Sequence, residues 1–144
     1  MLRITRNIRK TSCIAYRQLS MKTDITGNVI NSTNTAAIFA LDESIMDMLS
    51  SNKDARVRLT EAVNLDNSLY FARILKLFEC YRYQLDYSTC TNVALTLQNF
   101  DKLLEEGKLS SREGWYAAAA LAWYEGNYVQ AGRLLESSLI ENPR

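Results

Sequence analysis

The sequence has no histidine, a single proline and only five glycines among its 144 residues. Without histidine, a histidine-dependent catalytic triad, an HExxH zinc site and an imidazole proton shuttle are all excluded. The scarcity of proline and glycine leaves little turn chemistry for hairpin-rich sheets, so the composition favours helices. With 47% hydrophobic and 23% charged residues, a chain of this length is expected to form one domain with a real core.

The three cysteines, Cys13, Cys80 and Cys90, are odd in number and form no CxxC pair. We therefore expect a reducing compartment, with neither a disulfide framework nor a zinc site. Cys80 lies in a helical pattern and is expected to be a small buried hydrophobe rather than a reactive thiol. No glycine-rich phosphate loop or metal-ligand cluster occurs in the sequence. No catalytic residue, metal site or cofactor is therefore predicted, and we expect that the protein is not an enzyme.

The net charge of +1 is unevenly distributed along the chain. Residues 1–23 carry six basic side chains and no acid, whereas the rest of the chain carries 11 basic and 16 acidic residues. A mildly acidic body with one basic end is not typical of nucleic-acid-binding proteins, whose basic residues gather on a folded face. No nucleic-acid partner is expected.

Residues 1–31 are interpreted as a basic arm. Residues 24–33, which overlap its end, are interpreted as a polar linker to the helical region. The arm is rich in arginine, contains serine and threonine, and has large aliphatic residues scattered among its charges, as mitochondrial transit peptides do. Two other interpretations stand beside this one: a disordered basic tail, and an upstream start codon with Met21 as the true start. We expect a cytoplasmic protein, or a mitochondrial one if residues 1–19 are a transit peptide.

Apolar residues beyond the arm recur with a period near 3.6, which predicts helices. The six predicted segments are residues 36–49, 54–65, 69–83, 93–104, 113–124 and 128–141. Their short connections favour three antiparallel pairs. The predicted buried faces consist of Ala37, Phe39, Ala40, Leu41, Ile45, Met46 and Leu49 in the first helix, Ala55, Leu59, Ala62 and Val63 in the second, Phe71, Ile74, Leu75, Phe78 and Tyr81 in the third, and Tyr128, Ala131, Leu135, Ser138 and Leu139 in the last.

Helix boundaries follow from capping residues. Ser32 and Thr33 are the predicted N-cap residues of the first helix, because serine and threonine hydroxyls accept hydrogen bonds from free amides. Gly107 is predicted to end the fourth helix, and Asn142-Pro143 the last.

An alanine run lies within GWYAAAALAWYEGNY, residues 114–128. Only the eleven residues 114–124 lack charge, far fewer than the roughly 20 that cross a bilayer. Alanine is the strongest helix former and is depleted in strands. The run therefore predicts a helix with a small face that neighbouring helices approach closely, and no membrane partner is expected.

The last predicted pair resembles a tetratricopeptide repeat, a 34-residue helix–turn–helix unit with particular residues at fixed offsets. The matching positions are Trp115, Ala118, Ala119, Gly126, Tyr128, Ala131, Leu135, Ser138 and Pro143. The resemblance implies that these residues pack the repeat and that Gly126 supplies its turn. A degenerate copy lies 76 positions earlier, with Phe39, Ala55, Leu59, Ala62, Val63, Leu65 and Asp66 on repeat positions. In that copy Ser50 replaces the turn glycine and Asn67 the proline.

The chain from about Ser32 onward is similar to the amino-terminal part of the tetratricopeptide repeat protein 38 family. The similarity rests on STNTAAIFALDESIMDML, on the junction LTEAVNLDNSLYFARIL, and on residues 109–113. It covers about three-quarters of this chain but only the front of that longer family. It implies an all-α fold over residues 32–144: about three stacked antiparallel helical hairpins, a tetratricopeptide-like α-solenoid. No activity is firmly established for the family.

Repeat stacks of this kind usually bind peptide segments along the concave surface that their first helices line. The resemblance thus implies a non-catalytic protein–protein interaction scaffold whose partner is a protein or peptide ligand. The candidate peptide-binding surface consists of Glu113, Tyr116, Ala120, Trp123 and Tyr124. The alternative is that these aromatic residues pack against the next repeat. A chaperone-type carboxylate clamp is not expected, because Tyr116 and Ala120 occupy two of its positions.

Repeat arrays normally finish with a polar capping helix, whereas this sequence stops at Arg144, directly after the repeat-ending proline. The last hairpin is therefore expected to expose an apolar face of alanine and leucine side chains. A second copy, another partner, or continuation of the array past Arg144 would cover that face. In the last case the chain is a structural amino-terminal segment of a longer solenoid, without binding activity of its own.

Overall fold

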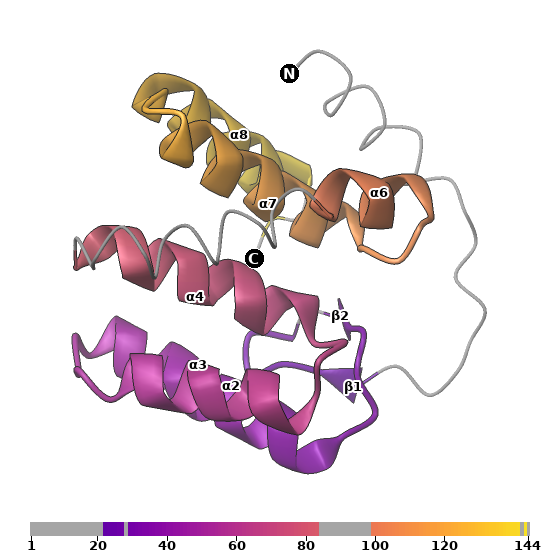
Figure 1. Cartoon of the computed structure of the whole chain (residues 1–144), viewed down its shortest axis with the longest axis vertical. Coiled ribbons are helices and arrows are strands. Elements are labelled where there is room, and N and C mark those ends of the chain that lie inside the picture. The colour runs from indigo at the N-terminus through magenta and orange to yellow at the C-terminus, as the bar shows by residue number, and fades with distance from the viewer. Residues whose placement is uncertain (1–21, 28, 84–98, 142, 144) are drawn as a thin grey trace. The chain divides into compact units, whose positions relative to one another are not determined.

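The computed structural model describes residues 22–27, 29–83, 99–141 and 143, except for the side chain of Asp101. This part of the chain is mostly helical, with six helices and one two-stranded sheet (Figure 1). The elements are β1 (Lys22–Thr23), β2 (Val29–Ile30), α2 (Thr35–Leu49), α3 (Ala55–Leu65), α4 (Tyr70–Arg82), α6 (Phe100–Glu105), α7 (Ser111–Tyr124) and α8 (Tyr128–Glu141).

Some predictions fall on residues outside the described part. These are the transit peptide or disordered tail within residues 1–21, Cys13 and Cys90, and the first half of the helix predicted at 93–104. None of the described helices is long and apolar enough to cross a membrane.

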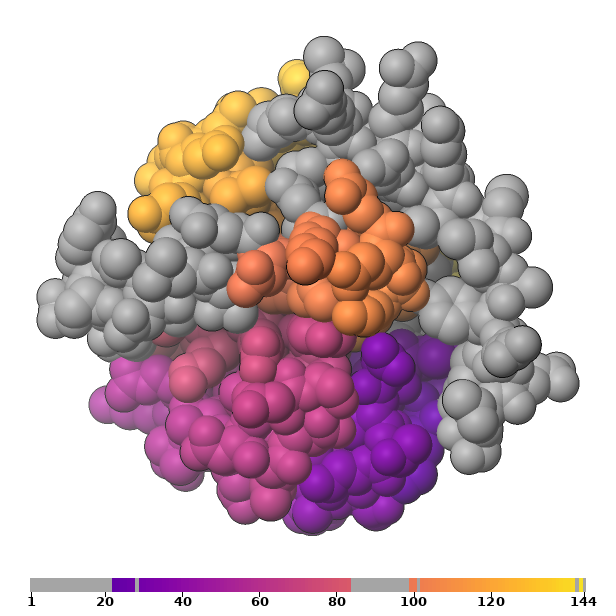
Figure 2. All heavy atoms as spheres, turned by 45° about the vertical axis from the view of Figure 1, so that its right-hand side comes forward, coloured from indigo at the N-terminus to yellow at the C-terminus, as the bar shows by residue number. Residues whose placement is uncertain are grey.

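The described residues divide into two compact units with a boundary inside α4. The amino-terminal unit comprises residues 22–27 and 29–79, and the carboxy-terminal unit residues 80–83, 99–141 and 143. Each unit contains one antiparallel helical pair, α2 with α3 and α7 with α8. The first and third predicted pairs are therefore confirmed. Of the second, the first helix is present as α4 and the end of the second helix as α6, but residues 84–98, which join them, lie outside the described part. The atoms of the amino-terminal unit, coloured indigo to magenta, adjoin closely on the face shown in Figure 2.

The amino-terminal unit begins with a β-hairpin where the sequence predicted a polar linker over residues 24–33. Strands β1 and β2 pair in antiparallel fashion, with Lys22 opposite Ile30, and the side chain of Ile30 is buried. Within the predicted linker, only Val29 and Ile30 are in a strand, and residues 24–27 lie in the connection between the two strands. Strands of two residues are too short to produce the alternating pattern from which a strand is predicted.

The turn of this hairpin is fixed by two aspartates. The Asp24 carboxylate accepts hydrogen bonds from the Thr26 amide at 2.9 Å and from its hydroxyl at 2.6 Å. The Ile25 amide then donates to Asp42 Oδ1 in α2 at 2.7 Å. The hairpin is therefore bonded to the helix that follows it.

Asn34 is the N-cap of α2, and the prediction of Ser32 or Thr33 is wrong. Asn34 Oδ1 accepts from the amides of Ala36 and Ala37, at 3.1 and 3.3 Å. Asparagine caps helices at least as well as serine or threonine. Ser32 helps to position this cap residue, because its hydroxyl accepts a hydrogen bond from the Asn34 amide at 3.1 Å.

The buried face of α2 differs from the predicted one. Phe39 is 63% exposed, and Met46 and Leu49 also lie largely in solvent, so their predicted burial is wrong. Ala37, Ala40 and Leu41 of the predicted face are buried, and Ile38 and Ser44 are buried beside them. The opposite helix, α3, buries Ala55, Leu59 and Ala62, as the sequence predicted. Across the pair, Arg58 Nε lies 2.7 Å from Asp47 Oδ2.

The end of α2 explains part of this difference. In the sequence alignment of the two repeats, Ser50 is equivalent to Gly126. In the structure, however, Ser51 is the residue with the positive φ, 59°. The register of α2 is therefore shifted by one residue from the alignment. With this shift, the residue equivalent to Trp115 is Ala40, which is buried, and not Phe39.

The α7–α8 hairpin forms where a helical pair was predicted, but Leu139, predicted on its buried face, is exposed. Ser110 and Glu113 form a capping box, in which the Ser110 amide donates to Glu113 Oε2 at 2.8 Å and the Glu113 amide to Ser110 Oγ at 3.1 Å. Gly126, with φ 78°, ends the turn after α7. The helices pack through small residues. The buried ones are Ala117, Ala118, Ala119, Ala120 and Ala122 in α7, and Ala131 and Ser138 in α8.

The ends of the hairpin opposite the turn are joined by Glu141. Its Oε2 accepts from Trp115 Nε1 at 2.7 Å and from Ser111 Oγ at 3.2 Å. The last turn of α8 is thereby bonded to the first turns of α7. The Trp115 side chain is itself buried.

Candidate functional site

Four aromatic rings meet where α7 ends and α8 begins. Trp123 stacks on Tyr81 from the last turn of α4, with ring centroids 6.2 Å apart and planes 6° from parallel. Tyr124 is tilted against the same Tyr81 ring at 6.5 Å. Tyr128 meets Trp123 edge to face, at 5.8 Å and 80°. These four residues, all in the carboxy-terminal unit, are called the aromatic cluster below.

Local geometry brings the cluster together. Trp123 and Tyr124 are the last two residues of α7, and the left-handed backbone of Gly126 reverses the chain so that Tyr128 returns beside Trp123. Offset and edge-to-face ring pairs each stabilise by about 0.5–1.5 kcal/mol beyond their burial. The rings therefore hold one another in a defined arrangement.

The cluster is also open to solvent. Trp123 is 38% exposed, Tyr124 41% and Tyr128 64%. Tryptophan and tyrosine dominate the binding energy of protein interfaces, because they bury large areas while losing little side-chain entropy. Rings that are both exposed and held in place by other rings provide a docking surface at low entropic cost.

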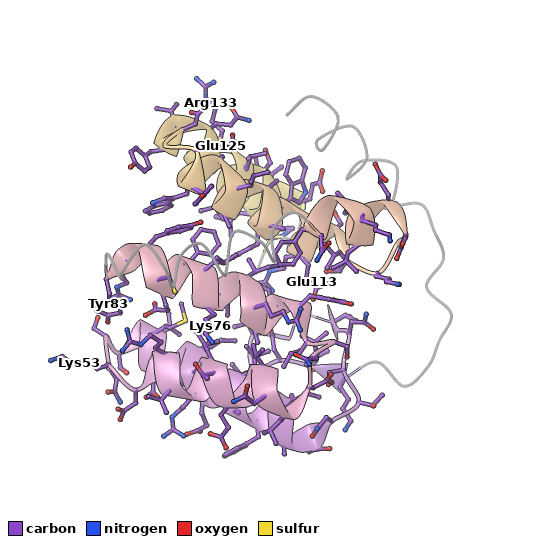
Figure 3. All side chains as sticks on the ribbon, viewed as in Figure 1. Lys53, Lys76, Tyr83, Glu113, Glu125 and Arg133 are labelled. Atoms are coloured by element: carbon purple, nitrogen blue, oxygen red, sulfur yellow. The ribbon has the colours of Figure 1, made fainter. Side chains whose placement is uncertain are left out.

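Two of the five residues of the predicted peptide-binding surface belong to this cluster, Trp123 and Tyr124. Glu113 and Ala120 are buried, and Glu113 is part of the capping box (Figure 3). A docking peptide does not reach these two side chains. Tyr116 is half-buried, with the Arg112 guanidinium 5.4 Å from its ring centroid.

The sequence placed the other two cluster members elsewhere. Tyr81 was predicted on the apolar face of its helix, and Tyr128 on the buried face of the last helix. The prediction for Tyr128 is wrong, because its position at the first turn of α8 leaves it largely exposed. The spacing of Trp123, Tyr124 and Tyr128 around Gly126 was a usable signal for the α7–α8 part. Nothing in the sequence linked Tyr81 to them.

Most of the remaining predicted packing residues are buried. Trp115, Ala119 and Ala131 are buried, Leu135 is half-buried, and Pro143 follows α8. Cys80, which precedes the cluster residue Tyr81, is buried as predicted. Among the described residues no group of three or more cysteine or carboxylate side chains could hold a metal ion.

Comparison with known proteins adds no assignment: no family model, curated protein or solved structure matches this chain.

Proposed function

We propose that this chain is a non-catalytic protein–protein interaction scaffold of the tetratricopeptide repeat type, and that the aromatic cluster is its peptide-docking surface. The observation that carries the proposal is the combination of ring packing and exposure at Trp123, Tyr124 and Tyr128. Its ligand is a peptide segment of another protein, anchored by apolar or proline side chains that lie flat on aromatic rings.

The repeat-type architecture is supported by the two hairpins. In both, the first helix ends with the same pair of backbone hydrogen bonds. After α7, Gly126 N donates to Trp123 O at 2.9 Å and Asn127 N to Ala122 O at 2.8 Å. After α2, Ser51 N donates to Met48 O at 3.2 Å and Asn52 N to Asp47 O at 2.8 Å. The same pair follows α6, so it is a general way of ending a helix. We propose, on the basis of the antiparallel helical pairing and the sequence resemblance, that the hairpins are units of an α-solenoid related to the tetratricopeptide repeat protein 38 family.

A second function is favoured by a different observation. Leu139 and Ile140 in the last turns of α8 are both more than half exposed. The alternative proposal is that the chain is a structural amino-terminal segment of a longer solenoid, and that the next helices cover these side chains. The exposed face is thus leucine and isoleucine rather than the expected alanine and leucine, because Ala131 is turned inward.

Selection from a random peptide library displayed on phage tests the docking surface. The bait is the full chain, compared with the double variant Tyr124→Ser/Tyr128→Ser. Tyr83→Ser is the matched control, because Tyr83 is also about 41% exposed but is not a cluster member. We expect a recurrent motif with the wild-type chain and the control, and its loss with the double variant.

Two results would contradict the docking proposal: no enrichment above the empty support, or the same motif with the double variant. Circular dichroism of each bait shows whether it is folded. The absence of enrichment with a folded wild-type chain would favour the structural-segment alternative.

A further inference from the structure

Four exposed residues lie along one line of α8. Val129, Arg133, Glu136 and Ile140 are separated by four, three and four positions, the spacing that forms a single seam on a helix. Val129 is 68% exposed and Ile140 79%, and the two charged residues are exposed as well. The opposite side of α8 packs on α7 through three buried residues, Ala131, Leu134 and Ser138.

The two charges on this seam have no ionic partner among the residues that the structure describes. Neither Arg133 nor Glu136 takes part in an ion pair with another described residue. The seam thus presents an apolar residue, a positive charge, a negative charge and an apolar residue in that order.

That order is self-complementary when the helix is reversed. Arg133 and Glu136 lie equally far from the midpoint between them, and so do Val129 and Ile140. We infer that α8 pairs with α8 of a second copy of this chain, antiparallel, about a two-fold axis through that midpoint. Val129 then lies against Ile140 of the second copy, and Arg133 lies against Glu136 of the second copy. The contact is isologous, because the same patch serves both copies.

Two further features favour this arrangement over the alternatives. A parallel pair would place Arg133 against its own equivalent, and Glu136 likewise, so that like charges meet. Gly132 and Ser137, two small residues that flank the seam on either side, also let the backbones approach. A Cβ added to Gly132 would meet nothing within 4 Å, so this side of α8 is open.

The size of the exposed face of α8 sets the expected strength of the dimer. Helix α8 has 14 residues and is therefore about 21 Å long. One helix face of that length buries less than the roughly 800 Å² per partner of a standard stable interface. We therefore expect a weak dimer that forms with increasing protein concentration. This inference is independent of peptide docking at the aromatic cluster.

Sedimentation equilibrium of the full chain, from roughly 10 µM to 1 mM, tests it over the range expected for a small interface. We expect a monomer–dimer equilibrium in the wild-type protein. Arg133→Glu or Glu136→Arg alone would place like charges opposite each other twice, and we expect each to raise the dissociation constant at least about tenfold. The double variant Arg133→Glu/Glu136→Arg recreates both opposite-charge pairs and is expected to restore dimerisation. Arg56→Glu, an exposed residue in α3, is the matched charge control.

Three results would overturn the inference. One is a monomer at every concentration, as expected if the seam is free or covered by further repeats. Another is a dimer that both single reversals leave unchanged, which would place the contact on a different surface. The third is a double variant that stays monomeric while circular dichroism shows it to be folded, because antiparallel pairing requires the rescue.

Discussion

Ser51 and Gly126 occupy the same position in the turns that end α2 and α7, and both have a left-handed backbone, with φ of 59° and 78°. Glycine adopts this conformation without strain, whereas serine meets a steric cost of roughly 1–2 kcal/mol. The first hairpin therefore carries strain that the last one avoids.

Replacing Ser51 with glycine is expected to stabilise the chain. The relief of left-handed strain outweighs the extra entropy of glycine in the unfolded chain, which leaves a gain of up to about 1 kcal/mol. Gly126→Val is expected to cost about 1–3 kcal/mol, from backbone strain rather than a clash, because a Cβ there would meet nothing within 4 Å. Urea unfolding measures both changes. Equal stability of all three proteins would refute the equivalence of the two turns.

Two neighbouring residues in α8 are expected to respond in opposite directions. Ala131 is buried against α7, so Ala131→Leu overpacks the interface and should cost about 1–3 kcal/mol. Gly132 is exposed and its Cβ position is open, so Gly132→Ala should gain up to about 1 kcal/mol of helix propensity. Thermal melting distinguishes the two. A stabilising Ala131→Leu would show that α8 does not pack on α7 through this residue.

Two asparagines at helix starts form a matched pair. Asn34 accepts from two amides of α2, and its Nδ2 donates to Leu65 O at 3.0 Å. Asn99 precedes α6 but makes no side-chain capping bond. Asn34→Ala should therefore lower the free energy of unfolding by about 1–2 kcal/mol, and Asn99→Ala by less than about 0.5 kcal/mol. Chemical denaturation of the two variants checks this, and the reverse order would contradict the assigned caps.

Acid is expected to weaken the junction between α3 and α4. Burial acts to raise the pKa of Asp66, but hydrogen bonds from Ser32 and Ser68 outweigh it, so that the pKa is lowered from the ordinary 3.8. A carboxyl with a depressed folded-state pKa stabilises the fold fully above its unfolded pKa, and this stabilisation is lost as the pH falls through the folded value. Asp66→Asn should therefore destabilise the protein at neutral pH. Its stability deficit should shrink below pH 3.8. A deficit that does not change with pH would contradict this.

Replacing Asp42, the matched residue, should change the stability at neutral pH in the opposite direction. Burial raises its pKa, an effect that the hydrogen bond from the Ile25 amide only partly opposes and that Asp24 and Glu43 reinforce. The charged form is therefore penalised in the fold at neutral pH, and the penalty disappears as the pH falls below the raised pKa. Asp42→Asn keeps an oxygen to accept from Ile25 and should stabilise the protein at neutral pH. A loss of stability there would refute the assignment.

The parts of the fold that the sequence predicts well are those that depend on local chemistry. Gly126 marks the turn of the last hairpin because few other residues adopt its backbone conformation cheaply, and the alanine run predicts the small face of α7. The burial of Ala55, Leu59 and Ala62 follows from helical period alone.

The parts that the sequence did not predict depend on which of two neighbouring residues forms a turn, or on contacts between residues far apart in the chain. Ser51 adopts a glycine-like φ that its residue type does not signal, so the register of α2 was off by one. Two of the four residues of the candidate site, Trp123 and Tyr124, could be predicted from the sequence, because they adjoin the turn. Tyr81 joins them from about forty positions away in the chain, and helical period carries no information about that contact.

The bond between Glu141 and Trp115 has a consequence for the motions of the last hairpin. A terminal helix usually opens from its free end, and its last amides then exchange their hydrogens quickly with solvent. Here the final turn of α8 is held to the start of α7 at 2.7 Å, while Gly126 joins the other end. The two helices are thus closed into a loop, so their amides are expected to become accessible together, in one cooperative opening.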